Sequence, residues 1–583
     1  MFVRPVRRRS PRVLIFVVLF GLLPAGLPAA TITVNSIVDT QSNDGQCTLH
    51  EAITAANTNT ASGAAAGECG AGEAAPTVDL IAFNIPGPGV KVISPLAPMP
   101  QIGQVVTIDG YSQPGAHANT LAVGNDAVLL IEIDGTNVGG DLFAIVGGGG
   151  STLRGLVINH LSFTAINIVS SNTNTIGGNF FGTDTTGASF LGTTAVPIRI
   201  SGNANIIGGT SPAARNVIVG GSSSFAGTVF ISGPSGGNLI QGNYIGVNAA
   251  GTAAMQPPAA TDAIEVLNSP DNVIGGAAAG AGNVILGTQF GIRLGAGSAP
   301  GNIVQGNFIG TDATGSVGLG GGTAISTDNG ASQITIGGAS PGAGNVISGN
   351  SRGIALGDGA AIIIIKGNKI GTNAAGTGAV PNGGNGIEIG VQGAGSIIGG
   401  VSPGEGNTIA FNCGLGISVG NGFTLTNWKM LGNSIHDNGG LGIALNGGTP
   451  TTNDPGDTDV GANNLQNYPV ITSAPIAAGV ATISGTLNST PDKAFRIEFF
   501  ANDRCDPSGF GEGRQFIGSI PAALTDGSGN AAFNAVPFPV AGAGVVFTAT
   551  ATDPDGNTSE FSQCFGTPDD LFNNGFEPSC PGA

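Results

Sequence analysis

Side chains that could carry out chemistry are few in this chain, and they are spread along a repeated segment. Glu265 and Arg293 occupy equivalent middle positions of two successive aliphatic triplets, so we expect an exposed ion pair between them. Acid–base cleavage of a glycosidic bond needs two carboxylates at a fixed separation, or a proton-abstracting base beside bound calcium. We expect no adjacent coil to offer a second carboxylate, and His160 and His436 lie at opposite ends of the repeats. The sequence therefore leaves the catalytic residues unknown.

Two aspartates sit in a loop that recurs along the chain. Asp184 and Asp312 belong to copies whose equivalents carry Asn248 and Asn373. Asp and Asn both cap turns through their side-chain oxygen, whereas a catalytic carboxylate could not alternate with an amide. We therefore interpret these residues as turn-capping.

Polar residues also occur in 77–160, a segment whose side chains the repeat alignment does not place. Those that could converge are Asp109, Tyr111, Glu132, Asp134 and His160. A cluster of three or more of them would favour an enzyme. Another acid–base pair to consider is His50 with Glu51.

Three aspartates occur within six residues, Asp454, Asp457 and Asp459, and could bind calcium through oxygen ligands. The run lacks the glutamate that ends an EF-hand loop, and we favour turn-forming Asx residues over a calcium site as its explanation. Calcium is therefore a possible ligand here, and no motif requires a cofactor.

The chain is organised by four near-copies of one phrase. They read GNFFGTDTTG from Gly178, GNYIGVNAAG from Gly242, GNFIGTDATG from Gly306 and GNKIGTNAAG from Gly367, and their starts differ by 64, 64 and 61 residues. Ten short triplets recur at about half that distance, with aliphatic outer positions and a variable middle position, as in Ile198-Arg199-Ile200. This alternation is typical of strands with one buried face, and the fixed period indicates a repeat architecture.

One asparagine falls at the same position in nine consecutive copies. The column consists of Asn179, Asn216, Asn243, Asn283, Asn307, Asn345, Asn368, Asn407 and Asn433. Stacked amides can hydrogen-bond along a stack, and the glycine that precedes eight of the nine suits a corner with an unusual φ. The sequence predicts a parallel β-solenoid over 77–447, whose ten triplets span roughly 45 Å at about 4.8 Å per coil.

These repeats resemble the right-handed parallel β-helix family with the pectin-lyase-like fold. Many members of that family cleave acidic polysaccharides, so the resemblance implies a polysaccharide lyase or glycoside hydrolase as an alternative function. Fold alone does not confer the activity.

The first thirty residues predict a secretory signal peptide. Five arginines in the first twelve positions precede an apolar run of about a dozen residues and a small-residue end at Ala29 and Ala30. An uncleaved anchor is the alternative, and no other stretch could cross a bilayer. Without those arginines, thirteen basic residues face thirty-six acidic ones, a net charge of −23, which excludes nucleic acid as a partner.

An exported chain with six cysteines is expected to contain disulfides. Cys47 pairs with Cys69 near the N-terminus, and Cys505 with Cys564 in the C-terminal domain. Cys413 stands alone in the solenoid, where we favour a buried free thiol over a bridge, and the state of Cys580 stays open.

The segment 31–76 predicts a short amphipathic helix, with Leu49, Ile53 and Ala56 at helical spacing. It resembles the CSLREA domain, because Cys47, Leu49, Glu51 and Ala52 match the motif of that name, while Thr48 and His50 replace its usual Ser and Arg. A solenoid end needs a cap, and we assign this segment to it.

After the solenoid, 448–467 has the composition of a linker, and alternating strands with turns over 468–566 predict a β-sandwich similar to bacterial immunoglobulin-like modules. Residues 567–583 form a tail of unassigned role. We thus expect an all-β, exported, non-catalytic solenoid that presents a surface for adhesion, glycan binding or envelope structure. Its partner would be a polysaccharide or a cell-surface ligand, with no membrane span after signal cleavage.

Overall fold

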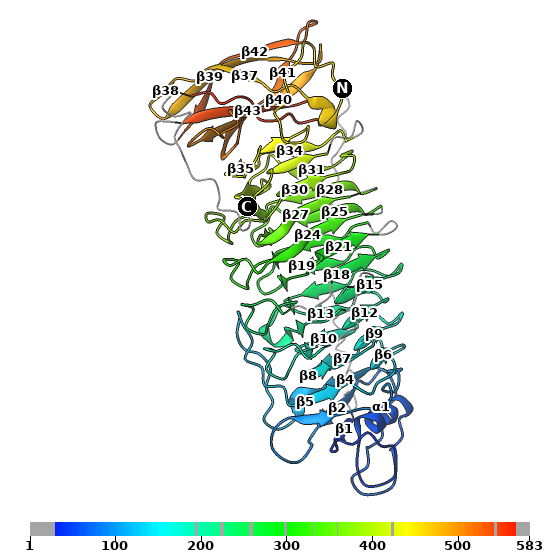
Figure 1. Cartoon of the computed structure of the whole chain (residues 1–583). Helices are drawn as coiled ribbons and strands as arrows, with labels where there is room; N and C mark the ends of the chain where they lie inside the picture. The colour runs from blue at the N-terminus through cyan, green and yellow to red at the C-terminus, as the bar shows by residue number, and fades with distance from the viewer. Residues whose placement is uncertain are drawn as a thin grey trace, which may run out of the picture.

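The protein is a rod of three long parallel β-sheets with a helix at one end and a sandwich at the other (Figure 1). The computed structural model describes residues 30–192, 196–221, 227–255, 261–295, 300–328, 330–357, 359–420, 425–540 and 545–566. The predicted signal peptide, up to residue 29, and the predicted tail lie outside these residues. The expected all-β solenoid is confirmed. Among the described residues, no helix has the length and hydropathy needed to cross a membrane.

Sheet A contains thirteen strands in chain order. They are β1 (Thr31–Val34), β2 (Asp79–Phe83), β4 (Val106–Asp109), β7 (Thr152–Arg154), β10 (Thr175–Gly177), β13 (Ile206–Gly208), β16 (Leu239–Gln241), β19 (Val273–Gly275), β22 (Ile303–Gln305), β25 (Ser332–Gly337), β28 (Ala361–Lys366), β31 (Ile397–Gly399) and β34 (Lys429–Leu431). The first strand belongs to the segment that the sequence assigns to the cap, and it pairs in parallel with β2.

Sheet B contains twelve strands, which follow those of sheet A after a tight corner in the long coils and after a longer loop in the short coils. They are β3 (Lys91–Ile93), β5 (Ile131–Asp134), β8 (Leu156–Asn159), β11 (Phe180–Phe181), β14 (Val217–Ile218), β17 (Tyr244–Ile245), β20 (Val284–Ile285), β23 (Phe308–Ile309), β26 (Val346–Ile347), β29 (Lys369–Ile370), β32 (Thr408–Ala410) and β35 (Ser434–His436).

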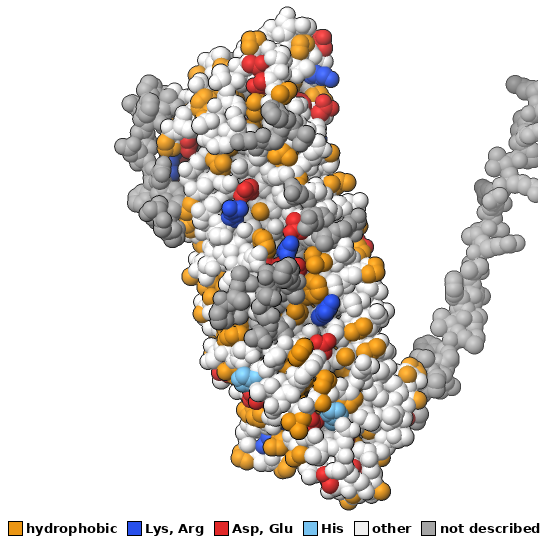
Figure 2. Space-filling model, turned by 45° about the vertical axis from the view of Figure 1, so that its right-hand side comes forward, with side chains coloured by type: hydrophobic (Ala, Val, Ile, Leu, Met, Phe, Trp, Pro, Cys, Tyr) orange, Lys and Arg blue, Asp and Glu red, His pale blue; other side chains and the backbone are white. Residues whose placement is uncertain are grey.

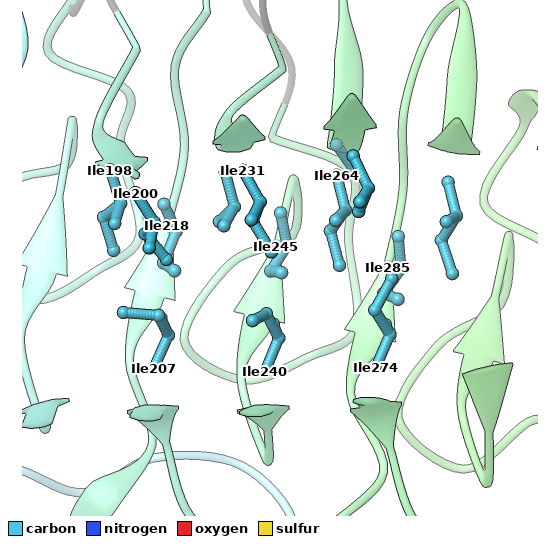
Figure 3. Close-up of a cluster of buried hydrophobic side chains, with 14 of the residues drawn as sticks. Ile198, Ile200, Ile207, Ile218, Ile231, Ile240, Ile245, Ile264, Ile274 and Ile285 are labelled. Carbon is cyan, nitrogen blue, oxygen red and sulfur yellow. The ribbon is translucent and has the colours of Figure 1, made fainter. Parts of the chain in front are cut away.

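Sheet C contains eleven strands, and ten of them are the triplets seen in the sequence. They are β6 (Phe143–Ile145), β9 (Ile166–Ile168), β12 (Ile198–Ile200), β15 (Val229–Ser232), β18 (Asp262–Leu267), β21 (Phe290–Gly295), β24 (Gly321–Thr327), β27 (Asn350–Leu356), β30 (Ile387–Ile389), β33 (Ile417–Val419) and β36 (Ile443–Ala444). From β4 onward each coil thus contributes one short strand to each sheet, whereas β1, β2 and β3 belong to two incomplete first coils. Isoleucines from all three sheets, such as Ile200, Ile207 and Ile218, meet in the fully buried interior (Figure 3).

The nine asparagines form a continuous ladder between sheets A and B. Each side-chain amide donates to the side-chain oxygen of the next asparagine at 2.8–3.3 Å. Two further ladders occupy the other corners and were not predicted. One joins Asn174, Asn205, Asn238, Asn272 and Asn302, and the other joins Asn350, Asn382, Asn412 and Asn438.

The glycines before the ladder serve two purposes, not the one expected. In the long coils, glycines such as Gly242 and Gly306 have a φ of +66°, which favours glycine. In the short coils, glycines such as Gly282 and Gly344 do not have a positive φ. A Cβ there would instead lie 2.0 and 1.9 Å from the carbonyl oxygens of the next coil, so close contact excludes a side chain.

The N-terminal end is closed by helix α1 (Leu49–Thr58). Its capping box uses Thr48 and Glu51, and His50 lies 2.9 Å from Asp39. His50 and Glu51 therefore have separate structural partners, which argues against a shared acid–base role. The disulfide Cys47–Cys69 ties the start of the helix to the following loop.

The C-terminal domain is a sandwich of two antiparallel sheets around an apolar core. One sheet contains β37 (Val470–Ser473), β38 (Ile476–Ala477), β39 (Val480–Asn488) and β42 (Asn530–Pro539), and the other β40 (Ala494–Asn502), β41 (Gln515–Leu524) and β43 (Val546–Thr552). The expected linker is packed rather than extended, because Asn463 is fully buried and donates to the carbonyls of Trp428 and Thr558.

The second disulfide joins Cys505 to Cys564. Cys413 is also disulfide-bonded, so the free thiol expected there is wrong. It lies half-exposed at a turn rather than in the sealed interior, and so remains within reach of another cysteine. Cys580 lies outside the described residues.

We predict that Asn283→Ala lowers the free energy of unfolding by about 3 kcal/mol, because it leaves buried donors and acceptors without partners. Asn283 accepts from the backbone N–H and the side-chain amide of Asn243, and donates to Asn307 and Ile240. Denaturant unfolding measures the change. Asn84→Ala, at an exposed asparagine, is the control, and equal effects of the two substitutions would contradict a stabilising ladder.

Candidate functional site

The outer face of sheet C carries a charged cluster around Arg293. Its guanidinium lies 3.3 Å from Glu265, 2.9 Å from Asp328 and 3.9 Å from Asp262. The predicted pair of Glu265 and Arg293 is present but not exposed, because Glu265 retains only 1% of its accessible surface. The expectation that no adjacent coil offers a second carboxylate is wrong, since Asp262 and Asp328 flank the triplets of their coils and both reach Arg293.

Burial determines the pKa values of the carboxyl groups in this cluster. Desolvation raises the pKa of Asp262 to about 6 and that of Glu265 to about 7, although Arg293 opposes both shifts. One oxygen of Asp262 and one of Asp328 are buried without a hydrogen-bond partner. A single cation thus faces three carboxylates that cannot all be ionised at low cost, and such a group could exchange a proton near neutral pH.

The polar residues of 77–160 make separate contacts rather than one cluster. Asp109 pairs with Arg154 at 2.7 Å, and the Tyr111 hydroxyl donates to the Gly178 carbonyl at 2.6 Å. Asp134 lies 3.4 Å from His160, and Glu132 accepts from Asn159 at 2.8 Å. Within the described chain no hydrogen bond or ion pair joins three of the five residues, so the convergence that would favour an enzyme is not found there.

The four near-copies build four projecting loops, 182–191, 246–255, 310–319 and 371–380, which we call the stacked loops. Each closes with an antiparallel bridge at its base. The loop Asp or Asn is a turn cap, since Asp312 Oδ1 accepts from the N–H groups of Ser316 and Val317 at 2.9 and 3.1 Å. Asp184 makes the equivalent bonds. These aspartates are therefore structural.

The stacked loops contact each other directly across the short coil between them. The N–H groups of Ala249, Ala313 and Ala374 donate at 2.8–2.9 Å to glycine carbonyls of the preceding loops, Gly187, Gly251 and Gly315. Each of these glycines also packs on an aromatic side chain of its own coil, which is Phe180, Tyr244 or Phe308, respectively. The 64-residue period is therefore the spacing of this loop ladder, two coils or roughly 10 Å.

A groove of about 620 Å³ lies between the third and fourth stacked loops. Its walls include Val317 and Val380, and its floor is the short coil at Gly349 and Ser351. None of the residues that line it is ionisable. The face drawn in Figure 2 carries few charges, and its acidic and basic side chains lie in a few small groups separated by neutral and hydrophobic surface. Such a groove can bind a neutral ligand but supplies no acid or base.

The three aspartates of the expected linker converge. One ligand oxygen from each of Asp454, Asp457 and Asp459 lies within 4.8 Å of the others. Asp454 and Asp457 also accept hydrogen bonds from the backbone N–H groups of Thr458 and Asn467, respectively, as turn-forming residues would. Asp459 Oδ1 is buried without a hydrogen-bond partner. The donor set, all carboxylate oxygens, fits the preference of calcium.

The sequence matches no family model and no curated protein. Solved structures similar to this chain include the periplasmic alginate epimerase AlgG, at 12% identity over 73% of this chain and 74% of that one, with a TM-score of 0.30. The A-module of the Azotobacter vinelandii mannuronan C-5 epimerase AlgE4 shares 13% identity over 64% and 91% of the two chains, with a TM-score of 0.29.

The surface adhesin PfbA of Streptococcus pneumoniae is similar to the same degree, at 11% identity over 70% of this chain and 89% of that one, with a TM-score of 0.26. Epimerases and an adhesin thus stand side by side among these structures. At these identities and TM-scores the likeness carries no argument about the activity of this chain.

We predict that Gly251→Ala destabilises the protein by about 2 kcal/mol more than Gly237→Ala. Both glycines have a φ of +70°, so the backbone strain is matched. A Cβ at Gly251 would lie 2.7 Å from the Ala313 Cβ and 2.8 Å from the Tyr244 ring, whereas at Gly237 it would meet nothing within 4 Å. Thermal unfolding of both variants measures the difference, and equal melting temperatures would show that the loops do not support each other.

Proposed function

We propose that this chain is an exported, non-catalytic β-solenoid that presents a long surface for binding a glycan or another cell-surface ligand. The observation that carries the proposal is the ridge of stacked loops with its groove free of ionisable side chains. Most of the described carboxylates that the sequence singled out are engaged in turns, caps and ion pairs. Glu132 accepts from Asn159, and Asp459 has one oxygen without a hydrogen-bond partner among the described residues. Disulfides in the described chain fit an oxidising compartment, in line with export.

The finer domain assignments belong to the same proposal. Residues 31–76 would be a CSLREA-like cap, 77–447 the β-helix, and 468–566 an immunoglobulin-like module. The chain would be exported through the signal peptide of residues 1–30, and 448–467 would join solenoid and sandwich.

Incubation of the mature protein with pectic, alginate and neutral polysaccharides tests the binding role. We expect an intact polymer to co-sediment with the protein, without new reducing ends or unsaturated uronate absorbance. Ser351→Trp places an indole on the groove floor and should weaken binding at least about tenfold, because the ring would clash with a ligand seated there. Ala375→Trp, on an exposed loop tip outside the groove, is the matched control. Product from any polymer would overturn the non-catalytic role.

The second candidate function is a polysaccharide lyase or glycoside hydrolase, and the cluster at Arg293 favours it. If turnover is found, Glu265→Gln should abolish it, because Gln keeps the shape of the side chain but cannot transfer the proton. Turnover that survives this substitution would exclude the cluster as its source.

We also propose that Asp454, Asp457 and Asp459 bind calcium. Calcium that binds only the folded chain raises the melting temperature by mass action. Asp459→Asn should remove that calcium-dependent rise without removing any hydrogen bond of Oδ1 within the described chain. Asp492→Asn, at an exposed turn, should keep it. An equal rise in both variants, or none in the parent protein, would contradict the site.

A further inference from the structure

Three glutamates of the sandwich reach the last coil of the solenoid. Glu498 accepts from the N–H of Gly432 at 2.8 Å, and Glu560 from that of Leu445 at 2.8 Å. Glu512 accepts from both the backbone and the side-chain amide of Asn438, at 3.2 and 2.9 Å. Asn438 ends the third asparagine ladder, so Glu512 takes the place of the next asparagine.

Backbone contacts complete the closure. Ile435 and Gly513 exchange two hydrogen bonds of 2.8 Å, which adds a short antiparallel segment to the edge of sheet B. Thr558 accepts from Met430 at the edge of sheet A. The open edges of all three sheets at this end are therefore occupied by the sandwich, which acts as a cap and not as a module displayed on a rod.

The three carboxyl groups differ in charge compensation. Glu498 has an ion pair with Arg496 at 2.8 Å. In the described chain Glu512 and Glu560 have no such pair. The charged and titratable groups around Glu512 are His436 and Asp437 from the solenoid and Asp503, Arg504, Asp506 and Arg514 from the sandwich. Both arginines bind Asp437, and Arg514 also pairs with Asp503 at 3.3 Å, so two carboxylates other than Glu512 compensate the two guanidinium charges. A buried carboxylate at Glu512 would be costly.

We propose that the sandwich closes the solenoid through a proton-dependent latch, in which Glu512 holds Asn438 as a neutral carboxyl and loosens the joint when it loses its proton. Glu498 and Glu560 fix the other two edges and keep the domain in place. The latch is independent of any ligand on the stacked loops.

The direction of the pH effect follows from burial. Desolvation raises the pKa of Glu512 to about 8, with Asp506 and Asp437 adding to the shift and Asn438 opposing it. An opened joint would return the carboxyl to its ordinary value near 4.5, so the closed state holds a proton that the open state has released between these values. Raising the pH from about 5 to about 8 therefore weakens the latch by up to about tenfold per pH unit, and above that range the loss stops.

The chain's single tryptophan reports on this joint. Trp428 is fully buried in the last coil. Its backbone N–H donates to the side-chain oxygen of Asn463, and its indole N–H donates to the carbonyl of Val391. We expect acrylamide quenching of its fluorescence in the mature protein to rise several-fold between pH 6 and pH 9. Glu512→Gln, which mimics the neutral carboxyl, should keep quenching low throughout. Glu388→Gln, at an exposed glutamate paired with Arg352, should follow the parent protein.

A pH-independent parent protein, or a Glu512→Gln variant that keeps the parent profile, would overturn the latch. If the variant does not fold, infrared difference spectra of the parent protein decide. The spectra are recorded in a Glu265→Gln background, because Glu265 also carries a proton near neutral pH. A protonated-carboxyl band that persists at pH 7.5 and is lost by pH 9 supports the proposal, and its absence at pH 7.5 refutes it.

Discussion

At the buried corners of the solenoid, polar groups need hydrogen-bond partners in the next coil. The strands are only two to seven residues long, so the corners bring backbone groups inside at each turn, and an unpaired group there costs about as much as a lost hydrogen bond. The three asparagine ladders meet this requirement, since one amide can accept from one coil and donate to the next. Isoleucine columns fill the space between the ladders. Coil length, strand length and glycine placement all follow from the need to keep these amides in line.

The stacked loops repeat every two coils, whereas the strands repeat every coil. A loop that projects from every coil would have only about 4.8 Å of room, less than two packed side chains require. Projection from alternate coils leaves room for a ring beneath each loop and for an alanine between loops. The fourth copy tests this account, because Lys369 replaces the ring and its aliphatic chain lies beneath Gly376. The spacing also leaves a short coil as the floor of the groove between two loops.

The strands and the ladder positions of the repeated coils could be predicted from the sequence, because aligning many copies shows which positions they share. The first ladder was visible since its asparagine keeps one position in nine copies, and the ten triplets of sheet C follow from the same alignment. The ladder that ends at Asn438 was hidden, because it has only four members and they lie outside the repeated phrases. Glu265 was placed correctly but its burial was missed, since Asp262 and Asp328 lie in flanks that do not repeat. Contacts between Glu512 and Asn438 have no local pattern at all.

The same distinction bears on function. A residue that recurs in every coil serves a role that every coil shares. A column of asparagines or glycines therefore indicates how the coils stack and does not indicate a ligand. Residues that depart from the repeat carry the individual properties of this protein. Arg215, the one non-glycine before an asparagine of the first ladder, lies 4.5 Å from the centre of the Tyr244 ring and donates to the carbonyls of Leu121 and Ala122. It thereby fixes a distant loop to the outer face of sheet B. Arg293 and Glu512 are departures of the same kind, and chemistry specific to this chain has to be sought among such residues.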